Sequence, residues 1–78
     1  MSVRAYVLIQ TEVGRAASVA KAVRELPHVE RSDDVTGPYD VIALAETDSV
    51  EELGRIVVTR IQMVEGITRT LTCPIVGD

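Results

Sequence analysis

The first half of the chain alternates between strand-like and helix-like spacing of apolar residues. A run rich in β-branched residues from Val3 to Ile9 predicts a strand. From Arg15 to Leu26 the spacing predicts a helix ended by Pro27, with an apolar face made of Ala16, Val19, Ala20, Val23 and Leu26. A more polar strand follows over residues 29–35, and alternation places four of its residues on one side: Val29, Arg31, Asp33 and Val35.

The second half opens with a turn over residues 36–39, followed by a strand from Asp40 to Ala45. Two overlapping signals mark the start of a second helix. Asp48 is placed to accept a hydrogen bond from the amide three residues later, and Ser49 with Glu52 forms a capping box one position further on. Apolar residues then continue at helical spacing, and they are Val50, Leu53, Val57, Ile61 and Val64.

Two glycines in this half have predicted structural roles. Gly54 lies inside the second helix, where glycine costs roughly 1 kcal/mol relative to alanine, so we expect the helix to approach the sheet closely there. Gly66 is expected to end the helix, and residues 67–73 then form the last strand, which Pro74 stops.

The element order is therefore β-α-β-β-α-β, which predicts an α+β domain of the ferredoxin-like type. In this arrangement a four-stranded antiparallel sheet carries both helices on one face, and its first and third strands are central. We expect residues 1–78 to form this single domain.

The two central strands carry apolar residues on both faces. Whichever face the helices cover, a second apolar set remains, and we identify it as Tyr6, Leu8, Ile42 and Leu44. An exposed apolar patch of this size usually marks an interaction surface. The sequence therefore predicts a homodimer, a dimeric α/β barrel in which two sheets pack face to face about 10 Å apart. The alternative is that these are ordinary, scattered surface residues.

Composition supports self-association and excludes several functions. A 78-residue chain without Phe or Trp builds a thin aliphatic core, and such domains are often stabilised by oligomer formation. The net charge of −4, with scattered basic residues, argues against direct binding of nucleic acid. We expect a cytoplasmic protein that does not bind membranes, because the single cysteine suits a reducing compartment and neither a signal peptide nor a membrane-spanning run is evident.

No catalytic constellation is evident, so we expect neither an enzyme nor a resident cofactor or metal. His28 is the only histidine and lies in a predicted loop, while Cys73 is expected to fill space as a small apolar residue. The richest local signal is residues 36–40, where Gly37 permits a positive φ and Pro38 presets the turn. Two interpretations remain open for it: a plain strand connection, or a ligand-binding loop held on a rigid scaffold.

Two segments carry a resemblance to a known family. They are Val35-Thr36-Gly37-Pro38-Tyr39-Asp40, with the strand after it, and the tail Val64-Glu65-Gly66-Ile67-Thr68-Arg69-Thr70-Leu71-Thr72. Both resemble the effector-binding (RAM) domain of the Lrp/AsnC transcription regulators, and the resemblance spans essentially the whole chain. It implies sheet-to-sheet dimers that assemble further and bind amino acids at contacts between dimers.

The resemblance also implies roles for individual residues. Gly37, Pro38 and Tyr39 would shape the pocket, and the backbone amides of this loop would donate hydrogen bonds to a carboxylate. Asp40 would meet an α-ammonium group, and Thr70 or Thr72 would add hydroxyls.

The regulators of this family carry a helix-turn-helix domain before the first strand, and no such residues precede it here, so we expect a stand-alone RAM domain without DNA binding of its own. It would act in amino-acid-responsive regulation of transcription or metabolism, by sensing an amino acid or by co-assembling with a full-length Lrp/AsnC regulator. The alternatives are a cofactor-independent dimeric α/β-barrel enzyme, such as a monooxygenase or isomerase, and an oligomerisation module without a ligand.

Overall fold

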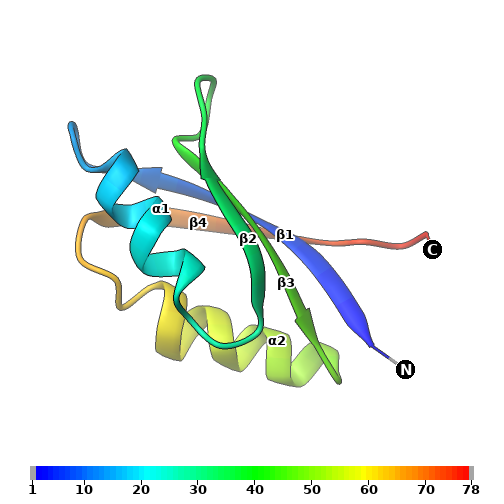
Figure 1. Ribbon diagram of the computed structural model, residues 1–78. Coiled ribbons are helices and arrows are strands. Elements are labelled where there is room, and N and C mark those ends of the chain that lie inside the picture. The colour runs from blue at the N-terminus through cyan, green and yellow to red at the C-terminus, as the bar shows by residue number, and fades with distance from the viewer. Residues whose placement is uncertain (1, 78) are drawn as a thin grey trace.

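The computed structural model describes residues 2–77 and has the predicted element order (Figure 1). The strands are β1 (Val3–Thr11), β2 (Val29–Asp34), β3 (Val41–Thr47) and β4 (Ile67–Pro74). The helices are α1 (Ala16–Arg24) and α2 (Val50–Ile56), which continues as the π-helical segment η1 (Val57–Ile61). The predicted elements are all present, with ends that differ by a few residues. The largest difference is that the second helix ends at Ile61 and not near Gly66.

The four strands form one antiparallel sheet in the order β2-β3-β1-β4, so β1 and β3 are central. Alternate residues of the central strands face the helices, which both lie on that side of the sheet (Figure 1). The resulting core is almost wholly aliphatic and consists of Ala5, Val7, Ile9, Val19, Ala20, Val23, Val41, Ala43, Ala45, Leu53, Val57 and Ile61. The predicted ferredoxin-like βαββαβ fold is confirmed. We call the sheet side without helices the open face.

The start of α2 follows the second of the two capping signals. Ser49 is the N-cap, and its hydroxyl accepts a hydrogen bond from the amide of Glu52 at 3.1 Å. The Glu52 carboxylate in turn accepts from the amide of Asp48 at 3.3 Å, which completes a variant of the capping box.

The expected close approach of Gly54 to the sheet is wrong. Gly54 is exposed, and a Cβ built there would meet no other atom within 4 Å. The core face of α2 is formed instead by its buried residues Leu53 and Ile56, with Val57 following in η1. Nothing within the described protomer explains the glycine at this position.

The prediction that Val29 lies on the same side of β2 as Arg31 and Asp33 is wrong. The register with β3 shifts between Val29 and Arg31, because Val29 pairs with Ala45 whereas Arg31 pairs with Leu44. This irregularity, a β-bulge, turns Val29 toward the helices, while Arg31 and the alternate residues after it face the open side. The buried Ser32 takes the helix-facing position next to Val29.

Candidate functional site

The loop over residues 36–39 is fixed to the end of β1 by hydrogen bonds on both sides. The amide of Val35 donates to the carbonyl of Asp40, and the amide of Asp40 donates to the carbonyl of Ile9, both at 2.9 Å. The Asp40 carboxylate accepts from the amide of Thr11 at 2.8 Å. A loop connecting two strands is thereby tied to a third strand, and its position relative to the sheet is well defined.

The tip of this loop is free to meet a ligand or a neighbouring subunit. Figure 1 shows it projecting beyond the end of the sheet, and Thr36, Gly37 and Pro38 are exposed. Gly37 has a φ of +150°, a conformation that side-chain-bearing residues rarely adopt. At the base of the loop lies a shallow depression of about 520 Å³, lined by Ala16, Asp34, Val35 and Thr36.

The two predicted threonines lie away from this loop. Thr70 pairs with Ile9 and Thr72 with Val7, so both threonines face the helix side of β4. The hydroxyl of Thr70 accepts a hydrogen bond from the side-chain amide of Gln62 at 2.8 Å. Since β1 separates β3 from β4, the loop and the threonines are about 10 Å apart across the sheet, two strand spacings.

A second shallow depression, of about 350 Å³, lies at the edge formed by β4 and the end of η1. Its lining residues are Gln62, Ile67, Thr68, Arg69 and Thr70. It shares no residue with the depression at the loop. Gly37, Pro38, Tyr39 and Asp40 therefore form one cluster within the protomer, and Thr70 and Thr72 belong to another. The sequence carries no signal for Gln62, because the contact of this residue with Thr70 depends on where η1 ends.

The open face carries the apolar residues expected there. Tyr6 is 46% exposed, Leu8 and Ile42 are partly buried, and Leu44 is 9% exposed. Strand β4 adds Leu71, which pairs with Leu8 and is 45% exposed.

Beside these residues β2 places an ion pair on the open face, with 3.1 Å between the Arg31 guanidinium and the Asp33 carboxylate. A depression of about 270 Å³ is lined by Tyr6, Arg31, Asp33, Val35, Ile42 and Leu44, with Ala43 at its base. The open face is therefore apolar at its centre and polar toward its β2 edge.

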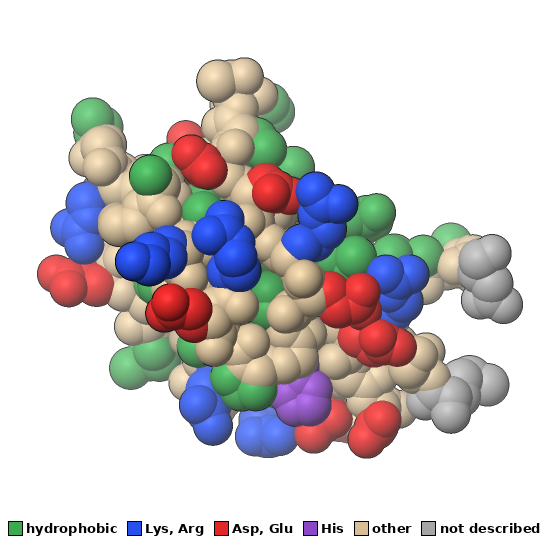
Figure 2. All heavy atoms as spheres, in the orientation of Figure 1, with side chains coloured by type: hydrophobic (Ala, Val, Ile, Leu, Met, Phe, Trp, Pro, Cys, Tyr) green, Lys and Arg blue, Asp and Glu red, His purple; other side chains and the backbone are tan. Residues whose placement is uncertain are grey.

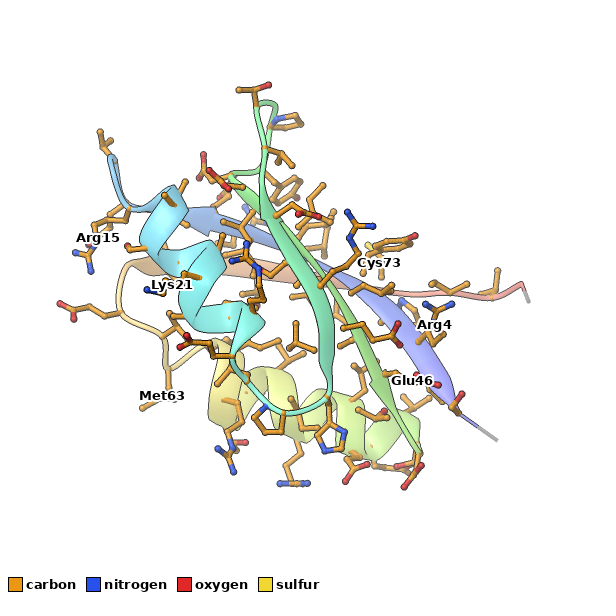
Figure 3. The ribbon with its side chains drawn as sticks, in the orientation of Figure 1. Arg4, Arg15, Lys21, Glu46, Met63 and Cys73 are labelled. Atoms are coloured by element: carbon orange, nitrogen blue, oxygen red, sulfur yellow. The ribbon has the colours of Figure 1, made fainter. Side chains whose placement is uncertain are left out.

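Charged residues group at one end of the open face. Arg4 on β1 pairs with Glu46 on β3 in the strand register, and the two lie close together in Figure 3. The Arg4 guanidinium also contacts the Glu30 carboxylate at 3.1 Å, and this hydrogen bond raises the pKa of Arg4. Interactions with the Ser2 hydroxyl, with Glu30 and with the positive charge of Arg4 lower the pKa of Glu46.

The charges are mixed on the face formed by α1 and β2. Figure 2 shows basic and acidic side chains interspersed over the face that α1 and β2 form. This pattern differs from the clustered basic surface that nucleic-acid binding requires.

The space between helices and sheet, where the enzyme hypothesis requires a pocket with an acid or a base, is filled by aliphatic side chains. The buried polar residues among those described are Ser32 and Thr47. Tyr6 and Asp33 do line a common depression, but it lies on the open face and the Asp33 side chain is 51% exposed. The hypothesis thus gains no support from this interior.

Cys73, expected to fill space as a small apolar residue, is exposed and pairs with Tyr6 on the open face. The described residues include no group of three or more His, Cys, Asp or Glu that would hold a metal ion. Within residues 2–77, no helix is both long and apolar enough to cross a membrane.

The protein is thus a ferredoxin-like domain with an apolar open face and a firmly held, exposed loop. The sequence comparison identifies the family. Residues 4–77 match the Lrp/AsnC ligand binding domain, so the chain belongs to this family. No curated protein gives a significant sequence match to the chain.

Three solved structures illustrate the relationship. TTHA0845 from Thermus thermophilus is 38% identical over 97% of this chain and 95% of its own, with a TM-score of 0.90. Escherichia coli AsnC is 19% identical with a TM-score of 0.89, and 97% of this chain corresponds to 52% of AsnC. The transcriptional regulator NMB0573 from Neisseria meningitidis, solved as a complex with L-Met, is 17% identical with a TM-score of 0.84 and matches over 97% of this chain and 51% of its own. At these low identities, the two regulators show the shared fold alone.

Proposed function

We propose that this protein is an amino-acid-binding, homo-oligomeric module that regulates transcription or metabolism. The observation that carries the proposal is the loop over residues 36–39, which is exposed at its tip and held at its base by backbone and carboxylate hydrogen bonds. Ligand sites are commonly built from loops that a rigid scaffold positions. The family match and the methionine complex of a structural neighbour favour a free amino acid as the ligand.

The proposed site takes its parts from two protomers. Gly37 and Tyr39 of one protomer supply backbone donors, Pro38 shapes the loop and Tyr39 adds an aromatic ring, while Thr70 and Thr72 of a neighbour supply hydroxyls. The separation of about 10 Å between the two groups within one protomer, across two strand spacings, supports this division. A small ligand at a subunit contact reaches both groups more easily than one bound to a single protomer.

The proposed assembly begins with a homodimer that buries the open face of each sheet. Tyr6, Leu8, Ile42 and Leu44 form its centre. The incomplete burial of Tyr6, Leu8 and Ile42 in the protomer supports this assignment, whereas Leu44 is already buried there. Dimers then associate further, in the cytoplasm, and a full-length Lrp/AsnC regulator is a candidate partner through the same surfaces. The mixed surface charge supports a role that does not include direct contact with nucleic acid.

Isothermal titration calorimetry with each of the twenty amino acids tests the proposal. Gly37→Val is expected to weaken binding at least about tenfold, because a β-branched residue is strained at a φ of +150°. Gly77→Val is the matched control, since Gly77 is exposed and has no comparable φ. The proposal fails if the wild type binds none of the twenty, or if Gly37→Val binds as tightly as the control.

A further inference from the structure

The main-chain hydrogen bonds of β1 alternate in direction along the strand. The carbonyl of Ile9 accepts from the amide of Asp40, on the β3 side, whereas the carbonyl of Arg4 accepts from the amide of Ile75, on the β4 side. Odd-numbered residues of β1 therefore direct their main-chain groups toward β3. Thr11 is the last residue of β1, and its amide points to the same side.

Strand β3 begins at Val41, which pairs with Ile9, so it does not reach the amide of Thr11. A partly buried amide without an acceptor is costly. The Asp40 carboxylate fills this position, with Oδ2 of Asp40 2.8 Å from the amide nitrogen of Thr11. The Asp40 side chain thus adds one more hydrogen bond between the two strands, just before the first residue of β3.

The same residue fixes the loop through its main chain. Its amide donates to Ile9 and its carbonyl accepts from Val35, so three hydrogen bonds hold Asp40 at the base of the loop. Gln10 adds a fourth bond, from its side-chain amide to the carbonyl of Pro38 at 3.3 Å. One oxygen of the carboxylate, Oδ2, is thus engaged by the protein, and this structural use differs from the expected role of meeting the ammonium group of a ligand.

We infer that Asp40 is a positioning residue of the ligand site. Its carboxylate holds residues 36–39 against the end of β1 by accepting from the amide of Thr11, and the ligand's ammonium group is bound elsewhere. The inference rests on the proposed function, because it assigns a role within that site. If Asp40 only positions the loop, ligand binding requires a side-chain oxygen that accepts from the Thr11 amide but does not require a negative charge at residue 40.

Two substitutions separate the acceptor from the charge. Asp40→Asn retains a side-chain oxygen that accepts from Thr11, whereas Asp40→Ala removes both the acceptor and the charge. With L-methionine as the probe in calorimetry, Asp40→Asn is expected to bind within about threefold of wild type, and Asp40→Ala to lose about tenfold or more. Asp48→Ala is the control, because it removes an equal charge from an exposed position at the opposite end of β3.

Hydrogen exchange of the ligand-free protein provides a second measurement that does not depend on binding. The amides of Thr11, Val35 and Asp40, which are hydrogen-bonded at the base of the loop, are expected to exchange faster in Asp40→Ala and to stay near wild-type rates in Asp40→Asn and Asp48→Ala. The inference is overturned if Asp40→Asn loses as much affinity as Asp40→Ala, which is the result for a direct ionic contact. It is also overturned if Thr11 exchange is unchanged in Asp40→Ala. If no amino acid binds the wild type, the proposed function fails, whereas the exchange data still decide the role of Asp40.

Discussion

Replacing Tyr6 with aspartate tests whether the open face is a dimer interface. Tyr6 lies in the middle of this face, between Leu44 on β3 and Cys73 on β4. Its side chain is 46% exposed in the protomer, so the protomer itself depends only in part on its burial. A face-to-face dimer would bury the remaining surface of Tyr6 in both copies at once, and an aspartate there would instead be buried as a charge.

The exposed fraction sets the size of the effect. A tyrosine side chain buries about 150–250 Å² in total, so 46% exposure leaves roughly 90 Å² for the partner to cover. At about 25 cal/mol per Å², this surface contributes roughly 2 kcal/mol per copy. Because two-fold symmetry changes both copies, the dimer loses roughly 4 kcal/mol, which raises its dissociation constant about a thousandfold. Desolvation of two carboxylates would weaken the dimer further.

Sedimentation velocity over a concentration series measures this change directly. The wild type is expected to sediment as a dimer or a larger assembly at micromolar concentration, and Tyr6→Asp as a protomer with an unchanged far-ultraviolet circular dichroism spectrum. Val13→Asp is the matched control, because Val13 is fully exposed in the turn after β1. A wild-type protein that sediments as a folded protomer would refute the reasoning, and so would a Tyr6→Asp variant with the wild-type distribution.

Three further predictions concern the protomer. Gly54→Ala should raise the free energy of unfolding by about 1 kcal/mol in urea denaturation, because the new methyl group meets no atom within 4 Å and alanine favours the helix. Ser32→Ala should be neutral or stabilising by about 1 kcal/mol, since the buried Ser32 hydroxyl has no hydrogen-bond partner among the described residues. Carboxyl NMR titration should find the pKa of Glu46 below its ordinary value of 4.5, and closer to it in Ser2→Ala, where the largest cause of the shift is removed. A lowered pKa means that Glu46 stabilises the fold above about pH 4.5 and that this contribution is lost as the pH falls through the lowered value.

Apolar spacing predicted the fold because each element buries one regular face. The alternation of Ala5, Val7 and Ile9 in β1 and the helical spacing of Val19 and Val23 in α1 are found unchanged in the core. The bulge that turns Val29 toward the helices was not predictable, because one extra residue in β2 leaves no mark on composition. The position of Gly54 was also misjudged, since helical spacing identifies the buried face but does not say why an exposed residue is glycine.

The candidate site was predictable only in its local part. Gly37 and Pro38 identified a turn with restricted geometry, and the structure has Gly37 at a positive φ. The bond between Asp40 and Thr11 joins residues 29 positions apart, and it depends on β3 beginning two residues short of that amide. Such a contact follows from strand register, which a single sequence specifies poorly at strand ends. The side of β4 on which Thr70 lies could not be predicted for the same reason, because it follows from the pairing of Thr70 with Ile9.

Strand β1 links the proposed assembly to the proposed ligand site, and the two remain separable by experiment. The side chain of Tyr6 serves the open face, whereas the main chain of Ile9 and Thr11, at the end of the same strand, holds the loop. Main-chain hydrogen bonds do not depend on which side chain occupies a distant position of the strand, so Tyr6→Asp leaves the bond between Thr11 and Asp40 intact. If the ligand needs two protomers, this variant should bind an amino acid only when its concentration restores the contact, as mass action requires. Asp40→Ala should instead show the same reduced affinity at every protein concentration, because the loop itself is displaced in each protomer.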